Sequence, residues 1–201
     1  MTSRLLRITT FVLLAAGSFL LADGCWIRTK AVLAQILLQH AWQESLDNKG
    51  KEVKPWPWAD TWPVARLRVS RLGVDLIVLE GESGEVLAFG PGHLPGSSDI
   101  GDSGHVVLAG HRDTSFRFLQ YLKNDDLVTV QRADGVTERY RITATGIYEA
   151  ERLYLPQKKH AFLSMITCYP FDTVQPGTSL RYMVSAAPSA AAVNSVAEER
   201  L

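Results

Sequence analysis

The strongest constraint on the fold is a series of short β-type segments that fills the chain from about residue 65 onward. Within them apolar and polar side chains alternate with a period of two, or β-branched residues form short apolar runs. Glycine-bearing turns such as Leu72-Gly73 and Asp134-Gly135 separate the segments. This pattern predicts an all-β fold, a closed or nearly closed antiparallel-rich β-barrel or sandwich of about eight strands with one or two short helices. The expected strands are 65–70, 74–79, 106–109, 127–131, 136–148, 162–168 and 179–185, with 85–89 as a doubtful member, and the one clear helix is expected at 113–122.

The N-terminal segment has the pattern of a membrane anchor. Arg4 and Arg7 precede an uncharged apolar stretch that, extended to Ile27, is long enough to span a bilayer. We predict an uncleaved, single-pass signal anchor over residues 1–27 in the inner (cytoplasmic) membrane, with the rest of the chain on the periplasmic or extracytoplasmic side. A cleaved signal peptide, a lipoprotein modified at Cys25 and a buried core helix are the alternatives.

Residues 28–54 are expected to form an amphipathic stem helix and a polar linker, because apolar residues recur there at helical spacing before a charged stretch. Three prolines between residues 55 and 63 exclude a regular helix and indicate a domain boundary near residue 55. The barrel is expected over 55–186. Residues 187–201 are rich in Ala and Ser and are expected to be a flexible tail.

Composition excludes several classes of function. The 21 basic and 21 acidic residues cancel, so the total charge gives no footprint for nucleic acid. The only cysteines, Cys25 and Cys168, cannot make a disulfide framework, and no Cys or His pair has the close spacing of a zinc site. We therefore expect no metal and no cofactor. Cys168 is either an inert core thiol or a reactive one.

Three residues could carry chemistry. Cys168 ends an apolar strand that Pro170 stops, and His111 likewise follows a buried run, so both are expected at the rim of the sheet. An imidazole within reach of a thiol can take its proton and later return it to a leaving amine. A hairpin would bring Arg181 beside the cysteine strand, where a guanidinium could bind an oxyanion, or it could be a solvated edge-strand arginine. His93 and His105 are weaker candidates than His111, and His40 and His160 are expected in solvent.

The segments Ala109-Gly110-His111-Arg112-Asp113-Thr114 and Met165-Ile166-Thr167-Cys168, with Arg181 on the next strand, together resemble the sortase family. The resemblance covers about residues 55–186, with the motifs in the family's order. Met165 and Ile166 differ from the more usual leucine-threonine-cysteine pattern, a conservative change. Residues 56–61, 90–93 and 168–171 resemble the sortase subgroup of Gram-negative marine proteobacteria.

The resemblance implies an eight-stranded β-barrel that cleaves a C-terminal LPxTG-like sorting signal of a protein substrate between Thr and Gly. Cys168 would be the nucleophile that forms a thioacyl enzyme, His111 the acid/base and Arg181 the cation on the oxyanion side. An amine, whose identity the sequence does not give, would resolve the intermediate. An L,D-transpeptidase is an alternative, but the signature of that enzyme class is absent around Cys168. An anchored cysteine hydrolase and a non-catalytic envelope β-domain that binds a protein partner stay open.

Overall fold

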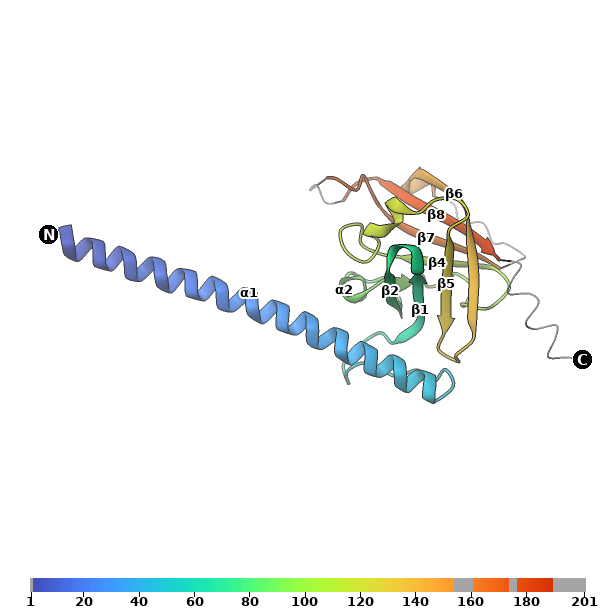
Figure 1. Cartoon of the computed structure of the whole chain (residues 1–201), viewed down its shortest axis with the longest axis horizontal. Helices are drawn as coiled ribbons and strands as arrows, with labels where there is room; N and C mark the ends of the chain where they lie inside the picture. The colour runs from blue at the N-terminus through green and yellow to red at the C-terminus, as the bar shows by residue number, and fades with distance from the viewer. Residues whose placement is uncertain (1, 154–160, 174–176, 190–201) are drawn as a thin grey trace, which may run out of the picture. The chain divides into compact units, whose positions relative to one another are not determined.

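The computed structural model describes residues 2–153, 161–173 and 177–189 of the 201-residue chain. The chain divides into two compact units, Met1–Leu37 and Leu38–Leu201. The first unit is the N-terminal part of a single long helix, and the second contains the end of that helix and a closed β-barrel (Figure 1). The expected fold class, an eight-stranded barrel with short helices after an apolar N-terminal helix, is confirmed.

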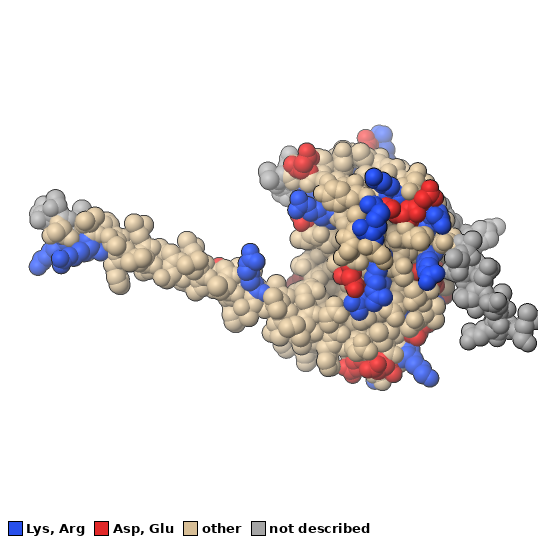
Figure 2. Space-filling view, viewed as in Figure 1, with Lys and Arg blue, Asp and Glu red and all other residues tan. Residues whose placement is uncertain are grey.

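Helix α1 (Thr2–Asp47) joins the expected anchor and stem helix without a break. Part of Leu6–Asp47 is long and apolar enough to cross a membrane. Large apolar side chains from Leu6 to Ile36 are exposed, and Figure 2 shows this stretch as a mostly uncharged surface between its basic residues. An exposed apolar helix of this length fits a lipid surrounding better than water.

Eight strands close the barrel in the order β1-β2-β3-β4-β7-β8-β6-β5. Two neighbouring pairs, β2/β3 and β4/β7, are parallel, and the other pairs are antiparallel. The strands are β1 (Pro63–Val69), β2 (Val74–Glu80), β3 (Gly92–His93), β4 (His105–Ala109), β5 (Leu127–Arg132), β6 (Thr137–Glu149), β7 (Phe162–Tyr169) and β8 (Leu180–Pro188). A closed barrel leaves no free sheet edge, which removes the main aggregation risk of an all-β domain.

Two hydrophobic clusters stabilise the second unit. Alternate residues of the strands, such as Leu67, Leu108 and Met165, fill the barrel interior. A second cluster lies on the outside of β2, where Ile77 and Leu79 meet Leu38, Trp42 and Val86. The last turns of α1 therefore fold as part of the barrel unit, since Leu38 and Trp42 are four residues apart on one helix face.

Two local expectations differ from the structure. The doubtful strand 85–89 is helix α2 (Gly84–Phe89), which begins because the Ser83 hydroxyl caps the backbone N–H of Val86. The helix expected at 113–122 is reduced to turns and the 3₁₀ helix η2 (Arg117–Tyr121). The backbone N–H groups of Thr114, Arg117 and Leu119 each donate to the carbonyl three residues before them, which is the pattern of turns and 3₁₀ helix and not of an α-helix.

The other two short elements are η1 (Ser70–Leu72) and η3 (Ala150–Arg152). Strand β8 extends to Pro188, two residues beyond the boundary expected at 186. Residues 190–201 of the expected tail lie outside the described residues, as do His160 and part of the turn expected at Pro176.

Candidate active site

Cys168 is the next-to-last residue of β7. Leu163 and Met165 on the same strand point into the barrel core, so the two-residue alternation turns Cys168 to the outer face. Its thiol is free and half-buried. Cys168 thus lies near the end of its strand, the position expected from the proline that follows it.

His111 lies two residues beyond the end of β4 (Ala109), and its side chain is exposed. Strand β4 runs parallel to β7, with Ala109 level with Ile166. The backbone N–H of Gly110 donates to the carbonyl of Ile166 at 3.1 Å, which continues this register past the end of the strand. Extending this register by two residues on each chain segment predicts that His111 lies level with Cys168, on the same outer face.

Arg181 lies on the other side of Cys168. It is the second residue of β8, and its Cα is the direct antiparallel partner of the Cα of Cys168. Directly opposed residues of an antiparallel pair have their side chains on the same face of the sheet. The Arg181 Nη1 donates to the carbonyls of Thr178 at 2.6 Å and Leu180 at 3.0 Å, so the guanidinium is held near the start of its own strand.

The register pairs Cys168 with Arg181 across β7 and β8, and its extension past the end of β4 predicts His111 on the other side of Cys168. A thiol between an imidazole and a guanidinium can act as a nucleophile whose proton the imidazole accepts, while the cation stabilises negative charge on the attacked carbonyl. This chemistry is acyl transfer.

Two further residues connect the exits of β4 and β7. The hydroxyl of Thr167, which is 2% exposed, donates to the carbonyl of Gly110 at 2.7 Å. Arg112 follows His111 and is buried, and its guanidinium donates to two backbone carbonyls after Cys168. We did not predict either role. The position of Arg112 next to His111 gave no sign that this charged side chain points inward.

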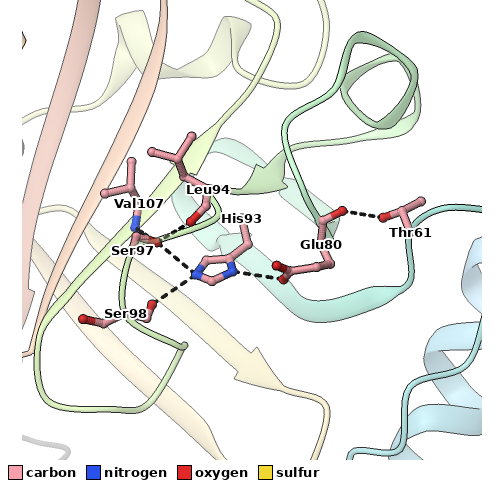
Figure 3. A network of polar contacts seen from close by, with 7 residues as sticks. All are labelled: Thr61, Glu80, His93, Leu94, Ser97, Ser98 and Val107. Carbon is pink, nitrogen blue, oxygen red and sulfur yellow. Dashed lines mark hydrogen bonds and ion pairs between the residues drawn. The ribbon is translucent and has the colours of Figure 1, made fainter.

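The two weaker histidine candidates are buried and hydrogen-bonded within the barrel unit. His93 is 4% exposed and lies between Glu80, 3.0 Å from its Nδ1, and the Ser98 carbonyl and Ser97 hydroxyl, each 3.0 Å from its Nε2 (Figure 3). Burial lowers the pKa of His93, but the hydrogen bonds and the negative charge of Glu80 outweigh burial and raise the pKa above its ordinary value. His105 is buried with its Nε2 2.8 Å from the Ser164 hydroxyl, and His40 is exposed as expected.

Within residues 2–153, 161–173 and 177–189, no group of three or more His, Cys, Asp or Glu residues is arranged to hold a metal ion.

Comparison with known proteins identifies the family. The model of the sortase domain matches residues 67–189. Sortase D of Bacillus subtilis (strain 168) is 31% identical over 110 residues, which are 54% of this chain and 55% of that protein. The alignment thus spans about half the length of this relative.

Solved structures share the fold. A Clostridium perfringens sortase D5 transpeptidase superposes with a TM-score of 0.63 at 18% identity, covering 79% of this chain and 99% of that one. The catalytic domain of SrtD from B. anthracis is 29% identical, with a TM-score of 0.52 and coverage of 63% and 87%. Because the family model spans more than half of the chain and the barrel agrees with it, the chain belongs to the sortase family of cysteine transpeptidases.

Proposed function

We propose that this sortase cleaves an LPxTG-like sorting signal at the C-terminal end of a protein substrate, between Thr and Gly, and transfers the acyl group to an amine. The observation that supports the proposal is the register of β4, β7 and β8, which pairs Cys168 with Arg181 and, extended past β4, predicts His111 on the same face. Each of these residues also lies in a segment that resembles a motif of the family.

In the first half-reaction the thiol of Cys168 gives its proton to His111, and the sulfur attacks the carbonyl carbon of the Thr residue. The negative oxygen of the tetrahedral intermediate faces Arg181. The two backbone bonds of Arg181 use only Nη1, so further N–H groups of the guanidinium can point to this oxygen. When the C–N bond breaks, His111 returns the proton to the nitrogen of the leaving Gly.

In the second half-reaction the acceptor amine attacks the thioester that now joins the Thr carbonyl to Cys168. His111 takes the proton that the amine loses, the C–S bond breaks, and the sulfur of Cys168 recovers its proton from His111. No cofactor or metal takes part in these steps, and the atoms balance with the peptide and the amine alone.

The proposal includes the cellular setting. Residues 1–27 would anchor the protein by a single pass in the inner (cytoplasmic) membrane, and residues 28–54 would connect the anchor to the catalytic barrel at 55–186 on the periplasmic or extracytoplasmic side. The exposed apolar surface of α1 supports the anchor. The motifs at 56–61, 90–93 and 168–171 support the narrower assignment to the marine proteobacterial subgroup, whereas the relatives described above carry the name sortase D.

The covalent mechanism is tested with two cysteine variants. Cys168→Ala should form no thioacyl adduct with a sorting-signal peptide, as measured by intact mass spectrometry, while its circular dichroism and melting temperature stay close to the wild type. Cys25→Ala is the matched control, because Cys25 is an exposed thiol on α1, and it should keep full activity. Peptide cleavage that persists in Cys168→Ala would rule out the thioacyl mechanism.

The same assay separates transfer from hydrolysis. With a primary amine present during turnover, a transpeptidase gives the peptide fused to the amine, whereas a hydrolase gives only the free acid. A chain that binds the peptide without an adduct or a product would be a non-catalytic envelope domain. Mass spectrometry of the products distinguishes the three outcomes directly.

A further inference from the structure

Arg112 is a charged side chain in a buried position, which is rare in folded proteins unless the charge is paired. It follows the candidate acid/base His111, yet it is only 6% exposed. Taking a guanidinium out of water costs several kcal/mol unless its donors are satisfied. A buried arginine must therefore be held by specific partners, and its partners indicate what it does.

Two partners of Arg112 belong to the loop that follows the candidate nucleophile. Its Nη1 donates to the carbonyl of Pro170 at 2.9 Å, and its Nη2 donates to the carbonyl of Thr173 at 2.8 Å. Its Nε lies 3.4 Å from a carboxylate oxygen of Asp113. The planar guanidinium thus spans two carbonyls of one loop, which the single ammonium of a lysine cannot do with the same geometry.

These bonds connect the two catalytic strand exits. At one end the backbone of Arg112 continues directly from His111, and at the other the bound carbonyl of Pro170 is two residues from Cys168. A shift of the loop relative to the exit of β4 would change the separation of thiol and imidazole. Such misplacement by about 1 Å can cost about 100-fold in rate.

We propose that Arg112 is a positioning residue that holds the loop after β7 against the exit of β4 and so keeps Cys168 in line with His111. This inference rests on the proposed roles of Cys168 and His111. Arg112 itself does not touch the reacting atoms. The loop has a second support, the ring of Phe171, whose centroid is 5.2 Å from that of Tyr182, so the barrel should fold without the guanidinium.

The test uses the full-length protein in detergent micelles, with Arg112→Gln and Arg112→Lys. The matched control is Arg66→Gln. It removes the two hydrogen bonds, 2.6 and 2.8 Å long, that the guanidinium of Arg66 on β1 donates to the carboxylate of Asp75 on β2. The substrate-free readout is the rate at which iodoacetamide alkylates Cys168, followed on the peptide that contains it. A thiol that has given its proton to an imidazole reacts faster than one that has not.

Both Arg112 variants should be alkylated more slowly than the wild type and the Arg66→Gln control. In a double-mutant cycle, His111→Ala combined with Arg112→Gln should be alkylated no more slowly than His111→Ala alone, because the arginine acts through the pairing of Cys168 with His111. A merely structural role would leave the two effects independent. Unchanged alkylation in both Arg112 variants, or independent effects in the cycle, would overturn the proposal.

Turnover of a sorting-signal peptide gives the second readout. The Arg112 variants should lose about 100-fold in kcat with little change in KM, since the loop positions the thiol rather than binding the peptide. A kcat equal to that of the wild type would also overturn the proposal. If the wild type itself does not cleave the peptide, the proposed substrate is wrong, and the alkylation cycle still decides the role of Arg112.

Discussion

Replacement of Thr167 by Val should destabilise the barrel at the point where the strands of the candidate site meet. The Thr167 hydroxyl donates to the Gly110 carbonyl at 2.7 Å, and both residues are buried. Valine keeps the branched shape of threonine but has no hydroxyl donor. The buried carbonyl oxygen of Gly110 would then lose its Thr167 partner, with no water in its place. An orphaned buried acceptor costs about 1–3 kcal/mol. For a chain of this size each kcal/mol lowers the melting temperature by about 2–4 °C, so we expect a loss of about 2–12 °C.

Two companion variants make the measurement specific. Thr167→Ser keeps the hydroxyl and loses one methyl group, at a cost of about 0.8 kcal/mol. Thr143→Val makes the same chemical change as Thr167→Val, because the Thr143 hydroxyl also donates to a strand carbonyl, that of Ser185 at 3.2 Å. Thr143 is exposed, so water can replace its hydroxyl and the cost should stay within about 0.5 kcal/mol.

Thermal unfolding of the four proteins, followed by circular dichroism, checks this order. Because Gly110 immediately precedes His111, Thr167→Val should also lower kcat more than Thr167→Ser does. A valine variant at position 167 as stable as the serine variant would refute the reasoning that the buried Gly110 carbonyl depends on the Thr167 hydroxyl.

Two further predictions concern other positions of the barrel. Gly110→Ala should lower the free energy of unfolding by about 1–3 kcal/mol, because a Cβ at this position would lie 2.7 Å from the fully buried ring of Phe116. The control is Gly84→Ala, which has open space around it and should be neutral or stabilising. His93→Gln should lower the melting temperature most at low pH. The pKa of His93 is raised in the folded protein, so its charged contact with Glu80 contributes fully to stability below the unfolded pKa of 6.5 and is lost as pH rises through the folded pKa. A difference in melting temperature between variant and wild type that widens toward pH 9 would contradict this prediction.

The strands could be predicted from sequence wherever burial alternates along them. Strand β1 is the clearest example, because its buried and half-buried residues alternate without exception from Pro63 to Val69. Strand β3 has only two residues, Gly92 and His93, which is too short for any period to appear. Helix α2 was missed although Ser83 carries an N-cap signal, because six residues give little more than one helical turn.

The parts of the site that could be predicted are those that depend on strand ends. A proline after Cys168 and a glycine before His111 mark the two exits, and the residue types suffice to suggest acyl transfer. The partners of Arg112 could not be predicted in the same way. Its bonds go to main-chain carbonyls, which every residue has, so no residue type at position 170 or 173 signals the contact.

The proposed pairing of Cys168 with His111 depends on the parallel pairing of β4 with β7, which joins segments 57 residues apart in sequence. A one-residue slip of that strand pairing would turn one of the two side chains to the barrel interior. The interior fixes the register, because Leu108 and Met165 are paired and both are fully buried, so a slip would expose one of them and bury a neighbour from the outer face. The Gly110 amide, the Thr167 hydroxyl and the Arg112 guanidinium then continue this register beyond the last strand pair. Hydrophobic burial in the core therefore sets the strand register on which the proposed site depends, and three polar groups at the strand exits extend that register.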